Sequence, residues 1–117
     1  MPLVQVFTSA RAPEPPAQQV LLGDLSRLLA ARFHKPERWV MTCLVPGLAM
    51  TFGGDPAPAA FVAVKNIGEM TGDDTSALSR AICDRLTQAL GVARDRIYIH
   101  FQDAVDYLWG WNGETFA

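Results

Sequence analysis

Apolar and polar residues alternate along the chain with two different periods, one typical of helices and one typical of strands. Residues 17–33 and 75–90 repeat apolar side chains every three or four positions, which gathers them on one helical face. Four shorter runs are rich in β-branched and aromatic residues and predict strands. These runs are residues 3–7, 38–45, 59–67 and 96–101.

Residues that start or stop helices bound the two helical segments. Pro15 and Pro16 suit a first helical turn, where their missing N–H groups cost little. Residues 34–36 (HKP) end the first helix, because the residue before a proline is disfavoured in the helical conformation. One of residues 73–75 (DDT) is expected to cap the second helix, and Gly91 stands where a C-terminal glycine belongs.

Turn residues divide the remaining stretches. After Pro46-Gly47, residues 48–52 predict a short strand that closes a hairpin-like excursion, and residues 53–56 (GGDP) form the next turn. Residues 107–111 predict a last short strand near the end of the chain.

The order strand, helix, strand occurs twice, in residues 2–45 and 59–101. Two β-α-β units predict an α+β sandwich of two layers, in which a four-stranded sheet carries both helices on one face and short edge strands are added. We expect residues 1–117 to be one domain, because the chain is too short for two cores. The strands are apolar on both faces, so the bare face predicts association with further copies of the chain.

Composition and charge narrow the function classes. Hydrophobic residues make up 50% of the chain and charged residues 19%, which favours a buried subunit interface in so small a protein. The formal net charge of −2, without a basic run, argues against a nucleic-acid partner or an anionic membrane. No apolar stretch reaches the ~18 residues of a spanning helix, and the start lacks a signal-peptide pattern. We therefore expect a cytoplasmic protein.

Residues that often carry chemistry are scarce. Cys43 and Cys83 lie far apart without a CxxC motif and in apolar surroundings, so we expect two inert thiols rather than a disulfide or a zinc site. His34 and His100 are the only histidines, and no third ligand stands at a telling spacing. Phosphate-binding loops and nucleophile elbows are absent. The sequence therefore predicts no metal and no cofactor.

The start of the chain is the strongest candidate for chemistry. Pro2 follows Met1 and opens the apolar strand at residues 3–7. We expect Met1 to be removed because proline is small, which would leave a free secondary amine at the head of this strand. An α-amine titrates near ~8 in water, and an apolar pocket lowers that pKa by disfavouring the charged form. Pro2 is therefore a candidate general base, although an ordinary Met-Pro start has the same sequence.

Short motifs from one end of the chain to the other occur in a telling order. They are Pro2, Lys35-Pro36, Phe52-Gly53-Gly54, Asn66-Ile67-Gly68, Asp95-Arg96-Ile97-Tyr98-Ile99, Gly110-Trp111-Asn112 and Thr115-Phe116-Ala117. In this order and spacing they resemble the macrophage migration inhibitory factor family of tautomerases. The resemblance implies a two-fold β-α-β fold, a homotrimer around a central barrel, and keto–enol isomerase activity on phenylpyruvate- or dopachrome-like substrates.

The resemblance also implies roles for single residues. Pro2 matches the catalytic N-terminal proline, which moves a proton between carbon and oxygen. Lys35 matches a cation near the pocket mouth, and Ile67 matches a pocket residue whose backbone also contacts ligands. Tyr98 matches a tyrosine from a neighbouring subunit, so each site would lie at an interface. The positions that line the pocket in relatives are occupied here by Trp39, Trp109 and Phe116.

Elementary chemistry agrees with the two central roles. An enolisation needs a base and a positive group that holds the negative oxygen, and Pro2 and Lys35 supply one of each. Simpler explanations stay open for single residues. Lys35 also suits the negative end of the first helix, and Tyr98 and the other aromatic residues also suit core or interface packing.

A few positions depart from the family pattern. His100 stands where well-known relatives carry asparagine, two residues beyond Tyr98, so its hydrogen bond to substrate would change with pH near neutrality. Ala59 and Val62 replace the CxxC of the vertebrate cytokine, which argues against thiol redox activity. Trp109 is bulkier than its counterpart and would narrow the pocket. These departures affect the expected substrate range more than the chemistry.

Two other functions stay open beside that of an isomerase acting on a small aromatic or enolisable keto acid. Wider relatives hydrate or dehalogenate small unsaturated acids, and Arg11 and Glu114 are the candidates for those roles. The other alternative is a cytokine-like binding protein with a vestigial pocket, which would leave the cell by non-classical secretion.

Overall fold

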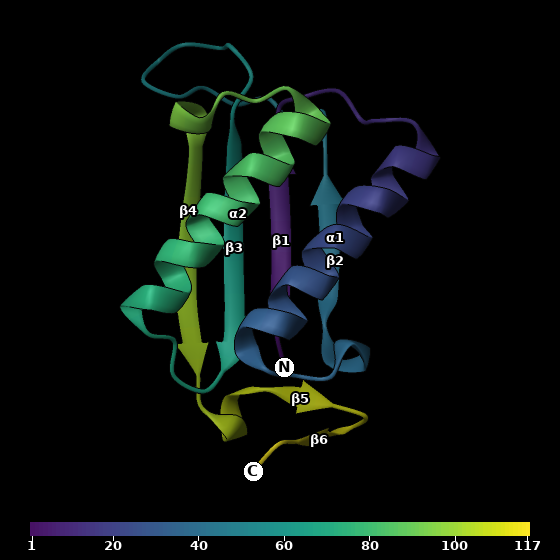
Figure 1. The fold of residues 1–117 in the computed structure, drawn as a ribbon, viewed down its shortest axis with the longest axis vertical. Helices are drawn as coiled ribbons and strands as arrows, with labels where there is room; N and C mark the ends of the chain where they lie inside the picture. Colours follow the sequence, from purple (N-terminus) through teal and green to yellow (C-terminus); the bar gives the residue numbers. More distant parts are fainter.

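Four strands form one mixed sheet in the computed structural model, which describes residues 1–117 (Figure 1). They pair in the order β2-β1-β3-β4, with β1 parallel to β2, β3 parallel to β4, and the central pair β1–β3 antiparallel. A helix connects the two strands of each parallel pair, which confirms the predicted α+β fold of two β-α-β units. In chain order the elements are β1 (Leu3–Thr8), α1 (Pro15–Phe33), β2 (Met41–Val45), β3 (Ala60–Ile67), α2 (Gly72–Leu90) and β4 (Ile97–Ala104).

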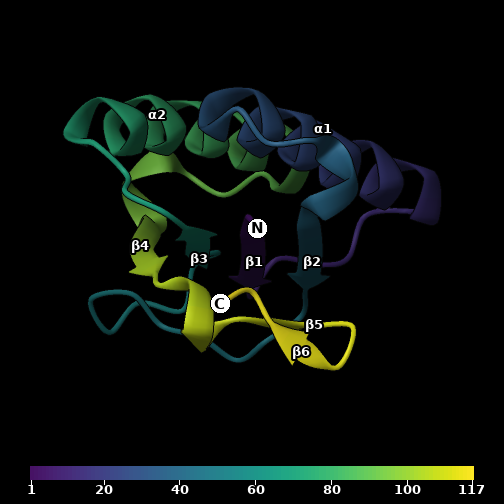
Figure 2. The ribbon, with the colours of Figure 1, turned by 90° about the horizontal axis from the view of Figure 1, so that it is seen from below.

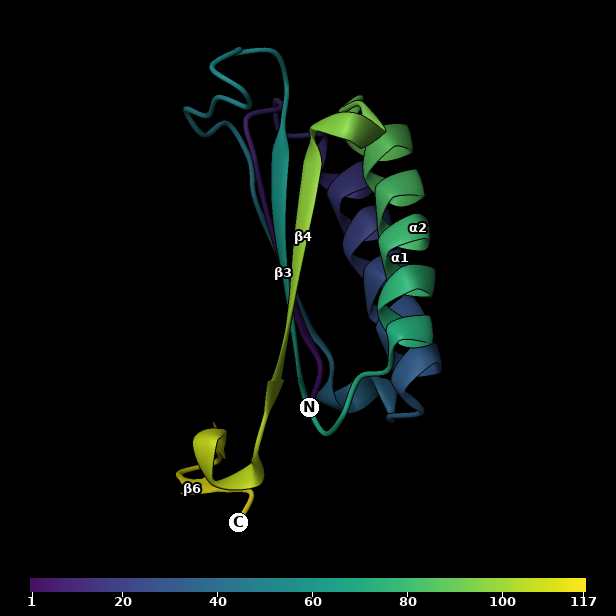
Figure 3. The same cartoon turned by 90° about the vertical axis from the view of Figure 1, so that its left-hand side faces the viewer.

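Both helices cover one face of the sheet, and the other face carries none (Figure 2, Figure 3). Residues along β1 alternate between buried and partly exposed, as expected for a strand that is covered on one face. The core lies between the layers, where valines of β1 and β3 meet the leucine-rich stripes of the helices. Its fully or almost fully buried members include Val4, Val6, Val62, Val64, Leu21, Leu25, Leu29, Leu78, Ile82 and Leu86. The predicted apolar periods therefore mark the core.

The helix ends follow local chemistry, with one correction to the prediction. α1 begins at Pro15 as expected, and Gly91 ends α2 in the left-handed conformation with φ 70°. The cap of α2, however, is Thr71 rather than one of residues 73–75. Its hydroxyl accepts a hydrogen bond from the Asp74 N–H (3.1 Å), and the Asp74 carboxylate accepts one from the Thr71 N–H (3.0 Å). This reciprocal capping box satisfies two orphan donors and so decides where the helix begins.

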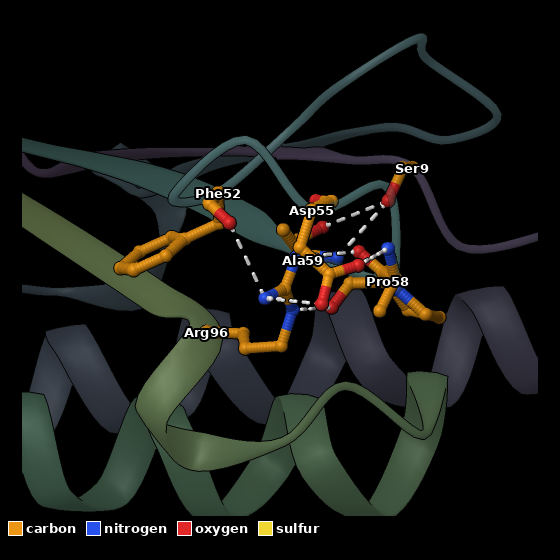
Figure 4. A network of polar contacts seen from close by, with 7 residues as sticks. Ser9, Phe52, Asp55, Pro58, Ala59 and Arg96 are labelled. Carbon is orange, nitrogen blue, oxygen red and sulfur yellow. Dashed lines mark hydrogen bonds and ion pairs between the residues drawn. The ribbon is translucent and has the colours of Figure 1, made fainter.

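The strand predicted at residues 48–52 is wrong. Only a single bridge joins Phe52 to Asp55 in this loop, because the loop runs beyond the end of the sheet and finds no strand to pair with. Arg96, just before β4, holds the loop instead (Figure 4). Its guanidinium donates hydrogen bonds to the carbonyl oxygens of Asp55 (2.8 Å), Ala57 (2.8 Å), Pro58 (2.9 Å) and Phe52 (3.4 Å).

Two other predicted strands have different bounds. β2 starts at Met41 rather than at residue 38, because Glu37–Trp39 forms a short 3₁₀ helix. The last predicted strand, residues 107–111, contains the end of a 3₁₀ helix and then β5 (Gly110–Trp111). β5 pairs with β6 (Glu114–Thr115) in a small hairpin of its own sheet. This hairpin lies at one end of the main sheet, on the side away from the helices (Figure 3).

The uncovered face of the sheet is mixed rather than uniformly apolar. The strand register puts Phe7, Phe61 and Tyr98 in one row at the end near the loop, and the other rows contain Gln5 with His100 and Lys65 with Gln102. The expectation of strands that are apolar on both faces is therefore only partly right. The exposed aromatic end, with Tyr98 at 66% exposure, still leaves apolar surface for a partner to cover.

Candidate active site

A cavity of about 500 Å³ opens at the end of the sheet where β1 begins. In Figure 2 the N-terminus lies beside β1, and the hairpin of β5 and β6 with the C-terminus lies next to it on the helix-free side. The cavity is therefore built by segments from both ends of the chain. Its lining residues are Met1, Pro2, Leu3, Arg38, Trp39, Val40, Met41, Lys65, Leu108, Trp109, Gly110, Trp111 and Phe116.

Pro2 is fixed at the head of β1. Its side chain is fully buried, and its carbonyl oxygen accepts a hydrogen bond from the Met41 N–H (3.0 Å) at the start of β2. The α-amine of Met1 lies in the same region, where burial and then the positive charge of Lys35 lower its pKa below the ordinary value. An amine in these surroundings is therefore neutral over a wider pH range than a solvated one.

Lys35 and Ile67 meet beside this region. His34 ends α1 in the left-handed conformation (φ 54°), and the Lys35 N–H then bonds to the Ala30 carbonyl oxygen (3.0 Å). This turn directs Lys35 towards the end of β3, where its Nζ donates a hydrogen bond to the carbonyl oxygen of Ile67 (3.4 Å). The two residues line a neighbouring hollow of about 380 Å³ rather than the Pro2 cavity itself.

Aromatic side chains form one wall of the Pro2 cavity. The Trp39 ring packs edge-on against Trp111, with centroids 4.8 Å apart, and against Phe116 at 6.4 Å. Trp111 and Phe116 are stacked at 6.3 Å, and the Phe116 N–H bonds to the Trp109 carbonyl oxygen (3.2 Å). Of the residues predicted for the site, the structure thus gathers Pro2 and three aromatic side chains around one cavity. Trp111, which the sequence analysis did not assign to the pocket, belongs to the same wall.

The cavity is also lined by two cations that were not predicted from the sequence. Arg38 lies with its guanidinium 5.5 Å from the centre of the Trp39 ring, and Lys65 lies across from Leu3 on the uncovered face of the sheet. Neither takes part in the four ion pairs of the chain, and the lining contains no Asp or Glu. Lys65 is the single charged residue in the apolar run 59–67, and this feature of the sequence could have marked it as a candidate site residue.

Tyr98 and His100 do not line the Pro2 cavity of their own chain. The register aligns Tyr98 with Phe61 and Phe7, which is five residues along β1 from Pro2, or about 16 Å. Tyr98 is exposed there and packs against the Phe52 ring, with centroids 4.7 Å apart. The structure of one chain therefore does not bring either residue to the cavity.

The remaining candidates are scattered. Arg11 and Glu114 do not line the cavity, and no three His, Cys, Asp or Glu side chains gather in a way that suits a metal ion. Both cysteines are free, and burial raises the pKa of the Cys83 thiol, which keeps it protonated and unreactive. Neither helix combines the length and hydropathy needed to cross a membrane.

Comparison with known proteins agrees with the fold. The family profile described as Macrophage migration inhibitory factor (MIF) matches residues 1–117. The Macrophage migration inhibitory factor of Xenopus tropicalis is 34% identical over 117 residues, which is 100% of both chains. The crystal structure of the homologue from Prochlorococcus marinus aligns with a TM-score of 0.92 and 43% identity, over 98% of this chain and 99% of that one. The Toxoplasma gondii factor has a TM-score of 0.92 and 30% identity, over 97% and 99%.

Proposed function

The chain belongs to the macrophage migration inhibitory factor family, and from that membership and the geometry of its cavity we propose that it is a keto–enol tautomerase. The base is the Pro2 amine, set free by removal of Met1. The observation that carries the proposal is the buried position of Pro2 at the head of β1, in a cavity where an amine has a lowered pKa.

The proton follows a short path in this mechanism. The neutral amine takes a proton from the carbon next to the substrate carbonyl, and the resulting ammonium returns it to the oxygen. Positive charge from Lys35 stabilises the developing enolate, as a preorganised cation does where water is excluded. The aromatic wall around Trp39 and Trp111 receives the apolar part of the substrate.

The unpaired cations of the cavity support an acidic substrate. Arg38 and Lys65 have no carboxylate partner in the chain, so a substrate carboxylate supplies the missing counter-charge. A small aromatic or enolisable keto acid, such as phenylpyruvate, combines this anion with an apolar body. Its conversion would take place in the cytoplasm, where Cys43 and Cys83 stay reduced.

We further propose that the protein works as a homotrimer. Tyr98 is exposed on the sheet face that lacks helices, two strands from β1 and about 16 Å from Pro2 of its own chain along the strand direction alone. A neighbouring subunit laid against this face would receive Tyr98 and His100 beside its own Pro2. The Arg11 and Glu114 pair needed for a hydratase or dehalogenase has no comparable support, because neither residue lines the cavity.

The test of the base is phenylpyruvate enolisation by the wild type, Pro2→Ala and Pro2→Gly, after mass spectrometry has established that Met1 is absent. General-base catalysis contributes about 10²–10⁴ in rate, so the variants should lose at least about tenfold. Wild-type protein without turnover, or variants as fast as the wild type, would sink the proposal. A folded protein that lacks Met1 and shows no turnover favours the cytokine-like alternative.

Mixing of variant subunits tests whether each active site is built from two neighbouring chains. If Pro2 and Tyr98 meet across an interface, co-refolding Pro2→Ala with Tyr98→Ala should regenerate some complete sites and recover activity that neither variant has alone. Sedimentation should give three times the mass of one chain. A monomer, or mixtures no more active than the sum of the parts, would contradict the trimer.

A further inference from the structure

One buried side-chain polar atom in the structure has no hydrogen-bond partner. Asn66, near the end of β3, is 3% exposed, and its Oδ1 is buried and unpaired. A buried acceptor without a donor costs free energy and is uncommon in native proteins. The other buried polar side chain, Thr8, donates from its hydroxyl to the Ala59 carbonyl oxygen (2.8 Å). Asn66 Oδ1 therefore calls for a donor that the chain does not supply while Met1 is attached.

The register of the central strands places Asn66 across from Pro2. β1 and β3 are antiparallel, with Leu3 opposite Lys65 and Val4 opposite Val64, so the next pair outward is Pro2 and Asn66. Both residues are buried, like Val4 and Val64, and therefore point towards the helix layer. Their side chains are neighbours on one face of the sheet.

The hydrogen-bond pattern makes this pair a close one. The Ser9 N–H donates to the Ala59 carbonyl oxygen (3.1 Å), so residue pairs alternate along the ladder from that point. The alternation makes Pro2 and Asn66 a non-hydrogen-bonded pair, in which Cα atoms are about 4.5 Å apart and side chains approach most closely. No backbone bond between the two residues competes with a contact between side chain and amine.

The hydrogen bonds that nearby cations make in this structure go to other acceptors. The Lys35 Nζ donates to the Ile67 carbonyl oxygen (3.4 Å), and Arg32 donates to the Asp74 carboxylate (2.8 Å). The nitrogen of Pro2 carries no hydrogen as long as Met1 is joined to it. Removal of Met1 changes this, because it creates an N–H on Pro2.

We propose that Asn66 is a positioning residue for the base: once Met1 is removed, its Oδ1 accepts a hydrogen bond from the Pro2 amine. This proposal rests on the proposed function of Pro2 and extends it. A neutral secondary amine has one N–H and one lone pair, so tying the N–H to Asn66 turns the lone pair away from Asn66 and frees it for the substrate carbon. After proton abstraction the ammonium has two N–H groups, one held by Asn66 and one available to protonate the substrate oxygen.

The test follows the protonation of Pro2 directly. NMR titration of isotopically labelled Pro2, in protein shown by mass spectrometry to lack Met1, compares the wild type with Asn66→Leu and Asn66→Asp. Leucine has the same shape without an acceptor, so the midpoint should move to lower pH by about one unit, the effect of one hydrogen bond to a charged group. Aspartate keeps the acceptor and adds negative charge, so the midpoint should move to higher pH.

A control separates positioning from folding. Thr8→Val removes a hydrogen bond from the other buried polar side chain, at the far end of β1, and should lower stability without moving the Pro2 midpoint. The other titratable groups around Asn66 are the same in all variants. They are Arg32, His34, Lys35, Glu69 and Asp74 in the neighbouring hollow, and Asp103, the register partner of Asn66 on β4.

The outcomes separate this proposal from the proposed function. A wild type that enolises phenylpyruvate, with a Pro2 midpoint unchanged in Asn66→Leu, overturns the role of Asn66 and leaves the tautomerase intact. If the wild type shows no turnover but the Pro2 midpoint moves as expected in the Asn66 variants, the hydrogen bond is supported and the proposed tautomerase activity is overturned. If Asn66→Leu does not fold, an Asn66→Asp midpoint at or below that of the wild type overturns the proposal.

Discussion

Arg96 offers the sharpest test of how the fold supports the proposed interface. Its side chain is 17% exposed and donates three short hydrogen bonds, to carbonyl oxygens of Asp55 (2.8 Å), Ala57 (2.8 Å) and Pro58 (2.9 Å). The fourth bond, to Phe52, is long at 3.4 Å. Replacement by methionine keeps the length of the side chain and removes every donor. The loop at residues 46–59 then loses all its hydrogen bonds to Arg96 and keeps only the packing of Phe52 against Tyr98 on the side of β4.

The expected cost can be worked out from these bonds. Hydrogen bonds from a charged group are worth about 1.5–3 kcal/mol each when buried. Water can replace the guanidinium at this partly exposed loop, so we take about 1 kcal/mol for each short bond and nothing for the long one. Contact of Arg96 with the Phe52 ring, at 5.5 Å, adds at most about 1 kcal/mol. Arg96→Met should therefore lower the free energy of unfolding by about 3 kcal/mol.

Urea unfolding at one fixed protein concentration measures this loss, because the stability of the proposed oligomer would depend on protein concentration. Arg96→Lys keeps the charge but not the planar fork of donors, so it should lose about half as much. Arg27→Met is the control, since its ion pair with Asp24 is on the surface and should contribute less than about 0.5 kcal/mol. A change below about 0.5 kcal/mol in Arg96→Met would refute the reasoning.

The loop should also respond locally. Phe52 packs against Tyr98, so release of the loop should increase proteolysis within residues 46–59 and weaken the contribution of Tyr98 to a neighbouring subunit. A loop as resistant to protease in Arg96→Met as in the wild type would show that its other contacts suffice.

Two further predictions concern the base and the core. Positive charge on Lys35 disfavours the ammonium form of the N-terminal amine, so Lys35→Met should raise the apparent pKa of that amine. As the pH is lowered, kcat/KM of the variant should therefore begin to fall at a higher pH than kcat/KM of the wild type. A fall that begins at a lower pH would contradict this. Leu25 is fully buried in α1, so Leu25→Ala should lower the free energy of unfolding in urea by about 2–5 kcal/mol. The control Val20→Ala, at a residue of the same helix that is 62% exposed, should lower it by less than about 0.5 kcal/mol. Equal losses would contradict the assigned core face of α1.

The helical segments were predicted within a few residues, because an apolar period of three to four is written into neighbouring positions. The cap of α2 was predicted among residues 73–75, and this was wrong because Thr71, which was not considered, has an equally suitable side chain. The reciprocal hydrogen bonds between Thr71 and Asp74 decide where α2 begins, and residue types alone do not reveal these bonds.

Errors in the strands and gaps in the site share one cause. The apolar run at residues 48–52 forms no strand because a strand needs a partner, and the sheet ends before it. Trp111 and Lys65 escaped assignment because their approach to Pro2 depends on the C-terminal hairpin and on the register of β3. The resemblance to a family identified which sequence positions belong to the site. Which of this chain's own side chains line the cavity depends on the three-dimensional structure.

The sequence by itself determined the two helices, the four main strands, their repeated order and the N-terminal proline as the candidate base. All of these depend on periods and signals within short stretches of chain. Tertiary structure alone decided which residues surround Pro2. Asn66 lies across from it although 64 positions separate them in the chain, because the antiparallel register of β1 and β3 is a property of paired backbones. The donor that Asn66 lacks and the base that the proposed reaction requires are thus one atom, the Pro2 nitrogen.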